Sequence, residues 1–406
     1  MNYKVIDGNV ASAKGFLASG MNCGVKEGST KKDVALIYSE VPCVGAGMYT
    51  NNKVKCAPIY VTKEHLQNSK AQAIIVNSGN ANCCTGQQGI DAAKDIAKCV
   101  AENLKLDVND VLIASTGVIG VPLDAEIIKK GVPTLKEKLS KVGSDAAEAI
   151  MTTDTVKKEC AVTLTLDGKT VTIGAIAKGS GMIEPNMGTM LSFISTDASI
   201  SADMLKEALK EVVNVSYNRI SVDGDTSTND TVLILANGLA ENTTISEKNN
   251  DYNSFVEALK YVTITISKML AKDGEGATKL IECTVNGCRN DQEGVVLAKS
   301  VITSSLVKTA MFGADANWGR ILCALGYSGI DFDQEAVDVY FENEEGSIIV
   351  CKNGASVDFD EDFAKKILLK SEITIRIEMN SGNCSVTAWG CDLTYDYVKI
   401  NGDYRS

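Results

Sequence analysis

The middle of this 406-residue chain reads Lys178-Gly-Ser-Gly-Met-Ile-Glu-Pro-Asn-Met-Gly-Thr189-Met-Leu-Ser-Phe193. Its three glycines and one proline disfavour a helix, so the segment predicts a loop that leads into an apolar strand from Met190 to Ile194. The loop ends in a small residue followed by a hydroxyl, the pair Gly188-Thr189. The residues alone are also explained by a glycine turn before a buried strand, so a chemical role for the pair needs support from elsewhere in the chain.

The chain has a single histidine, which restricts how a hydroxyl could be activated. His65 lies in the polar stretch Lys-Glu-His-Leu-Gln, so we expect an exposed surface residue rather than a catalytic base. A hydroxyl can instead be activated by its own α-amino group once the preceding peptide bond has been cut. The reference pKa of such an amine is about 8, which leaves a useful neutral fraction. Attack of the Thr189 hydroxyl on the carbonyl of Gly188, followed by hydrolysis of the ester, would expose that amine.

The loop and several other motifs together resemble one known family. Similar stretches are spread over nearly the whole length: Ala73–Asn82, Ala114–Gly120, Ile150–Thr155, Ser221–Asp230, Phe312–Arg320 and Ala388–Asn401. With the segment that starts at Lys178, they resemble the ArgJ family of arginine biosynthesis, the ornithine acetyltransferases (glutamate N-acetyltransferases). The resemblance implies a self-cleaving acyltransferase with an N-terminal nucleophile. The chain has Gly188 where alanine is usual and Ser406 where a terminal threonine is usual, and neither difference removes a catalytic group.

The resemblance also implies the residues of the active site. It makes Thr189 the nucleophile, with cleavage between Gly188 and Thr189, and it makes Thr116 and Gly117 the oxyanion-hole residues. A Thr-Gly pair suits this role because it offers a hydroxyl and an unshielded backbone N–H. The implied substrate-binding residues are Thr152 (with Thr153 as the alternative), Lys178, Thr189, Glu275, Asn401 and Ser406. In this assignment Lys178 supplies a cation for an amino-acid carboxylate, and Glu275 binds an amino group.

Composition and charge exclude several other classes of protein. A net charge of −12 and a pI near 4.8 argue against nucleic acid as a partner. No apolar run reaches the ~20 residues that cross a bilayer, so no membrane partner is expected. Thirteen cysteines, an odd number in a chain without a signal peptide, favour reduced thiols and a cytoplasmic location. Their spacing is not that of a zinc site, so we expect no metal. We also expect no bound cofactor, although acetyl-CoA is a second acetyl donor in bifunctional members of the family.

Apolar periodicity predicts a mixed α/β (α+β) fold. Helical spacing covers Gln88–Leu104 and Tyr252–Leu270, whereas short apolar runs such as Pro58–Val61 predict strands. From about residue 326 a strand–helix–strand pattern predicts a smaller C-terminal α/β domain. The resemblance implies a layered α-β-β-α sandwich of the DmpA/ArgJ type. It also implies two fragments, 1–188 and 189–406, that stay together as an α2β2 heterotetramer.

The function implied by the resemblance is ping-pong acetyl transfer from N2-acetyl-L-ornithine to L-glutamate through an acetyl-Thr189 ester. The products are L-ornithine and N-acetyl-L-glutamate. Two other classes fit the same residues. An N-terminal-nucleophile amidase or aminopeptidase would pass the acyl group to water, and an uncleaved small-molecule binding protein would not react at all. Transfer and hydrolysis differ in whether water is kept from the ester, which no sequence pattern reports.

Overall fold

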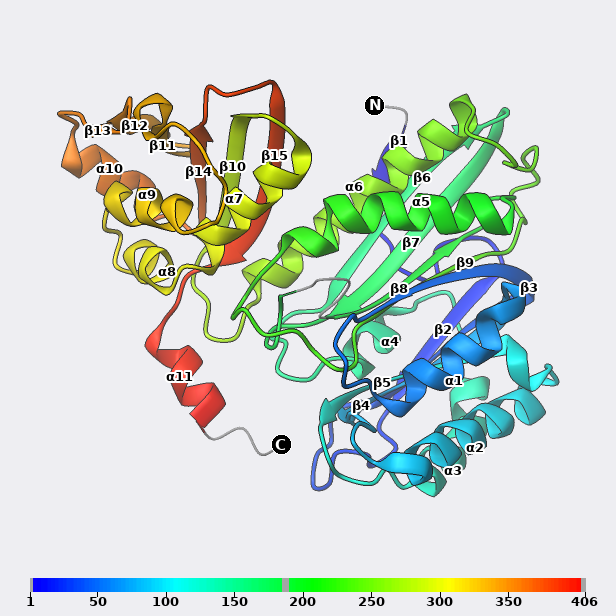
Figure 1. Cartoon of the computed structure of the whole chain (residues 1–406). Coiled ribbons are helices and arrows are strands. Elements are labelled where there is room, and N and C mark those ends of the chain that lie inside the picture. The colour runs from blue at the N-terminus through cyan, green and yellow to red at the C-terminus, as the bar shows by residue number, and fades with distance from the viewer. Residues whose placement is uncertain (1–2, 185–189, 403–406) are drawn as a thin grey trace.

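The computed structural model describes residues 3–184 and 190–402, which form two bodies, each built on its own sheet (Figure 1). Gly188, Thr189 and Ser406 lie outside the described residues. The chain passes from the larger body to the smaller one between helix α6 (Asn250–Lys272) and strand β10 (Leu280–Cys288). Helix α11 (Tyr395–Gly402) then extends from the smaller body back toward the larger one.

The larger body contains a nine-stranded sheet in which strands distant in sequence are neighbours. The order is β1-β6-β7-β8-β9-β3-β4-β5, with β2 paired to β3. Its strands are β1 (Tyr3–Ile6), β2 (Phe16–Met21), β3 (Val34–Tyr49), β4 (Lys70–Asn80), β5 (Val111–Val118), β6 (Lys158–Leu166), β7 (Lys169–Lys178), β8 (Leu191–Thr196) and β9 (Thr231–Ala236). The pairs β8–β9 and β4–β5 are parallel, and the other pairs are antiparallel.

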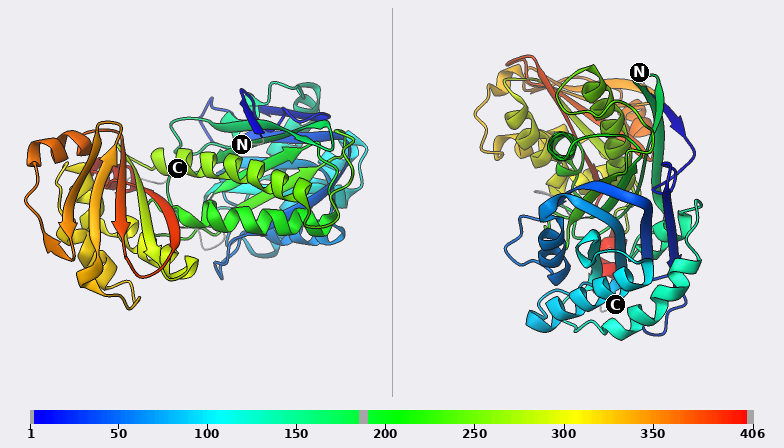
Figure 2. Two further views of the ribbon diagram at one scale, coloured as in Figure 1. Left: turned by 90° about the horizontal axis from the view of Figure 1, so that it is seen from above. Right: turned by 90° about the vertical axis from the view of Figure 1, so that its right-hand side faces the viewer.

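Helices cover both outer faces of this sheet, which curls so that its two halves face each other. These outer helices are α1 (Ala57–His65), α2 (Gly86–Leu104), α3 (Ala125–Glu137), α5 (Ala202–Val215) and α6, whereas the buried alanines of α4 (Ser144–Ala149) lie in the core between the two halves. Apolar residues of α5 and α6, the two long green helices of Figure 2, pack on β6 to β9, and those of α2 and α3 pack on β4 and β5. A third core between the two halves includes Ile74 of β4, Phe193 of β8 and Leu233 of β9. The predicted helix–sheet–sheet–helix layering is therefore confirmed.

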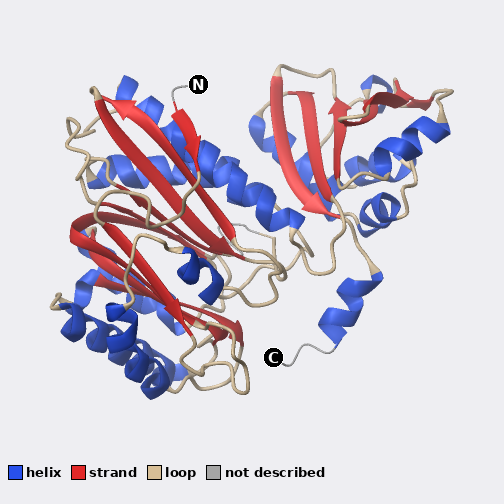
Figure 3. Cartoon of the chain, turned by 180° about the vertical axis from the view of Figure 1, so that it is seen from behind, coloured by secondary structure: helices blue, strands red, loops and turns tan. Residues whose placement is uncertain are grey.

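The smaller body is a six-stranded sheet in the order β13-β12-β11-β14-β10-β15, with its helices packed against it (Figure 3). Its elements after β10 are α7 (Asp291–Thr303), α8 (Ser305–Phe312), α9 (Trp318–Gly326), β11 (Asp338–Asn343), β12 (Gly346–Lys352), β13 (Ala355–Ser356), α10 (Glu361–Leu368), β14 (Glu372–Glu378) and β15 (Cys384–Cys391). The smaller domain, predicted to start near residue 326, begins earlier in the chain. Strand β10 begins at Leu280 and lies between β14 and β15, which come much later in the chain.

The strands around the central loop meet at one edge of the large sheet. Strand β7 pairs with β8 so that Lys178 lies opposite Leu191, and β8 pairs with β9 so that Leu191 lies opposite Thr231. The C-terminal end of β7 and the N-terminal ends of β8 and β9 therefore lie together at this edge.

The other end of β7 is joined to β6 by a tight turn. In this turn Asp167 has φ 47° and Gly168 has φ 71°, as in the type I′ turns of tight Asp-Gly hairpins.

Two local predictions are wrong. The segment Pro58–Val61, predicted as a strand, belongs to helix α1, where Pro58 lies in the first turn. Proline suits that position because its missing N–H has no partner to lose there. His65, predicted to be exposed, is 5% exposed, and its Nδ1 lies 2.8 Å from the carbonyl oxygen of Val111 in β5. The imidazole therefore links α1 to the sheet.

No single helix in the described part of the chain is long and apolar enough to cross a membrane. Helices α7 and α8 reach the required length and composition only as a pair, which is bent by 57° at the break. Apolar residues of both helices lie in the core of the smaller body.

Candidate active site

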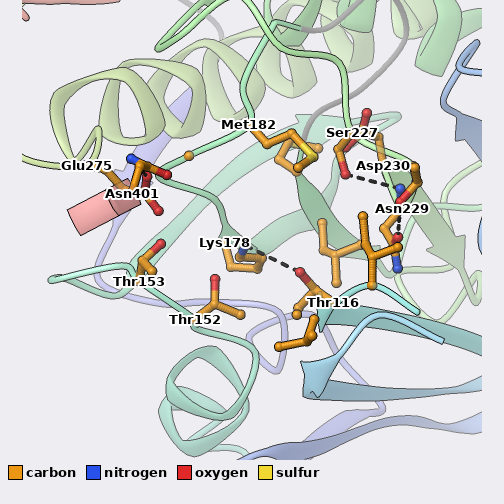
Figure 4. A pocket seen from close by; sticks show the side chains of 17 residues that line it. Thr116, Thr152, Thr153, Lys178, Met182, Ser227, Asn229, Asp230, Glu275 and Asn401 are labelled. Atoms are coloured by element: carbon orange, nitrogen blue, oxygen red, sulfur yellow. Dashed lines mark hydrogen bonds between the residues drawn. The ribbon is translucent and has the colours of Figure 1, made fainter. Parts of the chain in front are cut away.

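A cavity of about 360 Å³ opens at the edge where β7 ends and β8 and β9 begin (Figure 4). Its walls also include the end of β5, the loops after α4 and α6, and α11. The site positions predicted from the sequence that meet here are Thr116, Gly117, Thr152, Lys178, Glu275 and Asn401, together with the alternative Thr153. Gly188, Thr189 and Ser406 fall outside the part of the chain that the structure describes. The structure thus gathers the described positions, while the role of each one stays a prediction.

Thr116 and Gly117 lie at the C-terminal end of β5, where this strand runs close to β4. Gly117 has φ 133°, and a Cβ atom there would lie 2.3 Å from the carbonyl carbon of Gly79. Only glycine fits this position. The pair therefore brings a hydroxyl and an uncovered stretch of backbone to the cavity wall, and these are the donor types that stabilise an oxyanion.

Lys178 is the last residue of β7, and its side chain is buried. Its ammonium lies 3.5 Å from the hydroxyl of Thr116 (Figure 4), and no carboxylate among the described residues forms an ion pair with it. Burial lowers the pKa of Lys178 below its ordinary value, while the charge of Asp154 acts in the opposite direction. A cation held in this way at a cavity wall can bind the carboxylate of a ligand.

Asp154 is held as an anion beside Lys178. One of its carboxylate oxygens accepts hydrogen bonds from Lys158 Nζ at 2.6 Å and from the N–H of Gly179 at 2.7 Å. The other oxygen accepts from the N–H of Thr152 at 3.0 Å. Burial opposes ionisation, but the ammonium groups of Lys178 and Lys158 lower the pKa of Asp154 to about 2. Asp154 therefore fixes the backbone at Thr152 and next to Lys178, on two parts of the cavity wall.

Lys158 bridges two buried carboxylates. Its ammonium lies 2.6 Å from Asp154 and 2.6 Å from Asp273, and its side chain is fully buried. Asp273, the first residue after α6, also accepts a hydrogen bond from the N–H of Thr155 at 3.0 Å. The bridge therefore ties the loop after α4 to the loop after α6, which carries Glu275.

Glu275 faces Asn401 of α11 across one end of the cavity. Nδ2 of Asn401 donates a hydrogen bond to the Glu275 carboxylate at 2.8 Å. A Cβ atom at Gly181 would lie 2.4 Å from this carboxylate, so a larger residue there would displace the Glu275 side chain from its present position. Gly276, with φ 69°, allows α11 a similar close approach, because its Cβ would lie 2.5 Å from the backbone nitrogen of Tyr397. Two glycines thus let the C-terminal helix and the carboxylate come together.

Two further cavity residues, Asn229 and Asp230, have no role assigned from the sequence. Asn229 donates from Nδ2 to the carbonyl oxygens of Ala81 and Ser115, both at 2.7 Å, and so joins the loop before β9 to the ends of β4 and β5. Asp230 is buried, and burial raises its pKa well above the ordinary value. The position of Asp230 in the sequence could have indicated its place in the site. Neighbouring parallel strands begin at the same edge, so an acid directly before β9 lies beside Met190, the residue directly before β8.

Comparison with known proteins identifies the family. The model of the ArgJ family matches residues 17–406. The chain belongs to the ArgJ family. It is 54% identical over 399 residues to the arginine biosynthesis bifunctional protein ArgJ 1 of Clostridium acetobutylicum, with 98% of each chain covered. It is 48% identical over 402 residues to the ArgJ protein of Bacillus subtilis, with 99% of this chain and 97% of the relative covered.

A solved ArgJ structure also resembles this chain. The crystal structure of the arginine biosynthesis bifunctional protein ArgJ from Bacillus halodurans is 48% identical, with a TM-score of 0.51. It covers 53% of this ArgJ chain and 100% of its own. The resemblance read from the motifs is therefore confirmed, and with it the assignment to arginine biosynthesis.

Proposed function

We propose that this ArgJ chain is an acetyltransferase that moves the acetyl group of N2-acetyl-L-ornithine to L-glutamate. The observation that carries the proposal is the cavity, where a buried cation (Lys178), a carboxylate (Glu275) and the Thr116–Gly117 pair converge at the edge where β8 begins. An acyl amino acid has the complementary groups, which are a carboxylate, an amino group and an acyl carbonyl. Relatives named as bifunctional proteins of arginine biosynthesis support this class of substrate.

In this proposal the chain first cleaves itself between Gly188 and Thr189. The hydroxyl of Thr189 attacks the carbonyl carbon of Gly188, an ester bond forms as the C–N bond breaks, and the freed nitrogen takes up the hydroxyl proton. Water then hydrolyses the ester, which leaves a carboxylate on Gly188 and a free α-amine on Thr189. That amine, with an ordinary pKa of about 8, is the base of the mature enzyme.

Acetyl transfer follows in two half-reactions. The Thr189 amine accepts the hydroxyl proton as Oγ attacks the acetyl carbonyl carbon, and Thr116 and Gly117 donate hydrogen bonds to the oxyanion. The C–N bond then breaks, the proton passes to the leaving nitrogen, and L-ornithine departs from acetyl-Thr189. The amine of L-glutamate attacks this ester by the reverse steps, and N-acetyl-L-glutamate leaves.

The remaining site residues orient the amino-acid part of the substrate. Lys178 binds the substrate carboxylate with Thr152 nearby, and Glu275 and Asn401 bind the substrate at the end formed by α11. Ser406 is proposed as a further substrate-binding residue. These steps use no metal and no permanently bound cofactor. Acetyl-CoA is proposed as a second acetyl donor, in keeping with the word "bifunctional" in the relatives' names.

We also propose that fragments 1–188 and 189–406 remain associated after cleavage and assemble as an α2β2 heterotetramer. Strands β8 and β9 of the second fragment lie between β7 and β3 of the first, which supports a lasting association of the fragments. Separation would leave edges of the sheet unpaired and would expose apolar core.

Incubation of the purified protein with N2-acetyl-L-ornithine, with and without L-glutamate, tests the proposed reaction. We expect sustained release of L-ornithine only with both substrates, together with an equal amount of N-acetyl-L-glutamate. Free acetate without N-acetyl-L-glutamate would instead assign the amidase alternative. A persistent full-length band on a denaturing gel, without turnover, would assign the binding protein.

A further inference from the structure

Asp230 lines the cavity but has no complete set of partners. It directly precedes β9 and is 2% exposed. The N–H of Thr231 donates to the carbonyl oxygen of Met190 at 3.0 Å, so Asp230 lies beside the residue that precedes β8. Its Oδ2 is buried and has no hydrogen-bond partner within the described residues. A buried polar oxygen of this kind on a cavity wall calls for a ligand as its partner.

The surroundings of Asp230 favour its uncharged form. An ionised carboxylate carries a large desolvation cost when one of its oxygens is buried without a donor. Burial raises the pKa of Asp230 well above its ordinary value, although the Ser227 hydroxyl, the Lys178 ammonium, the Thr50 hydroxyl and the Met190 N–H act in the opposite direction. A protonated carboxyl group has one O–H donor to offer.

The position of Asp230 in the cavity indicates which part of the substrate would contact it. Figure 4 shows Asp230 at one end of the cavity and Glu275 and Asn401 at the other, with Lys178 between them. Lys178 and Glu275 match the carboxylate and the amino group of an amino acid. If the side-chain amino group of N2-acetyl-L-ornithine lies at Glu275 and its carboxylate at Lys178, the acyl group on the α-nitrogen points toward the end where Asp230 and Thr116 lie.

We propose that Asp230 is a further catalytic residue, which holds a proton and donates it in a hydrogen bond to an oxygen of the bound acyl group. This inference rests on the proposed acetyl transfer. The hydrogen bond stabilises the negative charge that develops on the acyl oxygens when the carbonyl is attacked. An uncharged acid can act in this way, whereas an ionised carboxylate would repel the developing charge.

Two substitutions test whether Asp230 acts as a hydrogen-bond donor or as an ionised carboxylate. Asp230→Asn keeps an uncharged N–H donor, so kcat/KM for acetyl transfer should fall by no more than ~5-fold. Asp230→Ala removes the donor, and the fall should reach ~100-fold or more, the usual effect of losing one such donor. Self-cleavage is scored separately on denaturing gels. An equal and severe loss in both cleaved variants would overturn the proposal, and so would an Asp230→Ala variant within ~3-fold of the wild type.

Infrared spectroscopy detects the proton directly and needs no turnover, so it also decides the case if Asp230→Ala does not fold. The wild-type minus Asp230→Asn spectrum at neutral pH should contain the carbonyl stretch of a protonated carboxyl group, shifted in D2O. Carboxylate bands in its place would overturn the proposal. Because this readout is independent of the substrate, failure of the inference can be told apart from failure of the proposed acetyl transfer.

Asp197→Asn is the matched control. Asp197 is also buried and follows the other end of β8, but its carboxylate accepts hydrogen bonds from the N–H groups of Lys14 at 2.9 Å and Thr172 at 2.7 Å. This substitution should lower thermal stability and leave kcat/KM of the folded protein unchanged. A loss of kcat/KM equal to that of Asp230→Ala would mean that any buried aspartate of this sheet has the same effect, which would overturn the proposal.

Discussion

Asp154 and Asp230 both act on the charge of Lys178, and their own pKa values are shifted in opposite directions. Burial favours the uncharged form of both carboxyl groups, but the pKa of Asp154 is lowered to about 2 and that of Asp230 is raised, so the difference comes from their partners. Asp154 accepts from Lys158 and from the N–H groups of Thr152 and Gly179, whereas Oδ2 of Asp230 has no partner among the described residues. Two acids whose pKa values are pushed apart in this way can act as a fixed anion and a proton holder in one site.

At the scale of single residues, we predict that Asp154 keeps Lys178 charged. The pKa of Lys178 is lowered, so its ammonium is present below that pKa and is lost as the pH rises through it. Asp154→Asn removes the main opposing charge and lowers this pKa further. As the pH is raised, the KM for N2-acetyl-L-ornithine should increase in both proteins, and in the variant this increase should begin at a lower pH than in the wild type. The rise should reach ~10-fold, as for a lost charge-assisted hydrogen bond, in steady-state kinetics across a pH series.

Asp273→Asn is the control for this experiment. Asp273 shares Lys158 with Asp154, but the largest opposing charge on Lys178 is that of Asp154. The control should lower stability without moving the pH at which KM rises. Identical pH profiles for Asp154→Asn and the wild type would contradict the electrostatic role of Asp154.

Motifs predict several residues that line the cavity, but not the partners of those residues. Asp154 lies inside the motif Ile150–Thr155, yet its charge depends on Lys158 and on the N–H of Gly179, which only the fold brings near. His65 shows the converse. Its polar neighbours in sequence predict exposure, whereas its place on α1 turns the ring toward Val111.

At the scale of elements, the ion bridge at the start of β6 holds the two loops that carry Thr152 and Glu275. Lys158→Met would leave two buried carboxylates without their cation, so we expect the free energy of unfolding at neutral pH to fall by about 3–5 kcal/mol. In the wild type the lowered pKa of Asp154 gives stability above the ordinary aspartate range, which is lost as the pH falls toward 2. The difference in the free energy of unfolding between the wild type and the variant should therefore become smaller as the pH falls. Urea unfolding at one protein concentration and several pH values measures both effects.

Lys272→Met is the matched lysine control, because Lys272 pairs with Glu372 on the surface, where the two side chains are 51% and 62% exposed. It should change the free energy of unfolding by less than about 0.5 kcal/mol. A deficit of Lys158→Met that is as small as that of the control would show that the buried bridge does not hold the loops.

Helices with a regular apolar spacing could be predicted from the sequence. A short helix whose start depends on the position of one residue, such as α1 with Pro58, could not. The spacing over Gln88–Leu104 predicts α2 to within two residues, since α2 begins at Gly86. The run Pro58–Val61 has an apolar composition that also suits a strand, and the position of Pro58 in a first helical turn becomes clear only from the structure. Apolar runs this short fit either element.

At the scale of the whole molecule, the large sheet joins the two proposed fragments. Cleavage between Gly188 and Thr189 should give fragments that co-elute in gel filtration under native conditions and separate only in denaturant. The reason is the strand order β7-β8-β9-β3, in which β8 and β9 of the second fragment pair with each other, β8 pairs with β7 of the first fragment, and β9 pairs with β3 of the first fragment. Elution of the cleaved fragments as two separate native species would contradict this prediction.

The extent of the smaller body could not be predicted because its sheet is assembled from distant segments. Alternating apolar residues mark β11 and β14 clearly, but β10 looks like a strand of the preceding body until its parallel pairing with β14 is known. The same limit applies to the cavity, whose walls come from the ends of strands that no local pattern places together.

Intact-mass spectrometry before and after incubation with N2-acetyl-L-ornithine alone tests the central claim most directly. The account predicts one fragment that ends at Gly188 and one that begins at Thr189, with a single acetyl group on the second fragment that disappears when L-glutamate is added. Thr189→Ala should remain one chain and carry no acetyl group. Release of L-ornithine by a wild-type protein that never becomes acetylated, or by Thr189→Ala at the wild-type rate, would contradict the account.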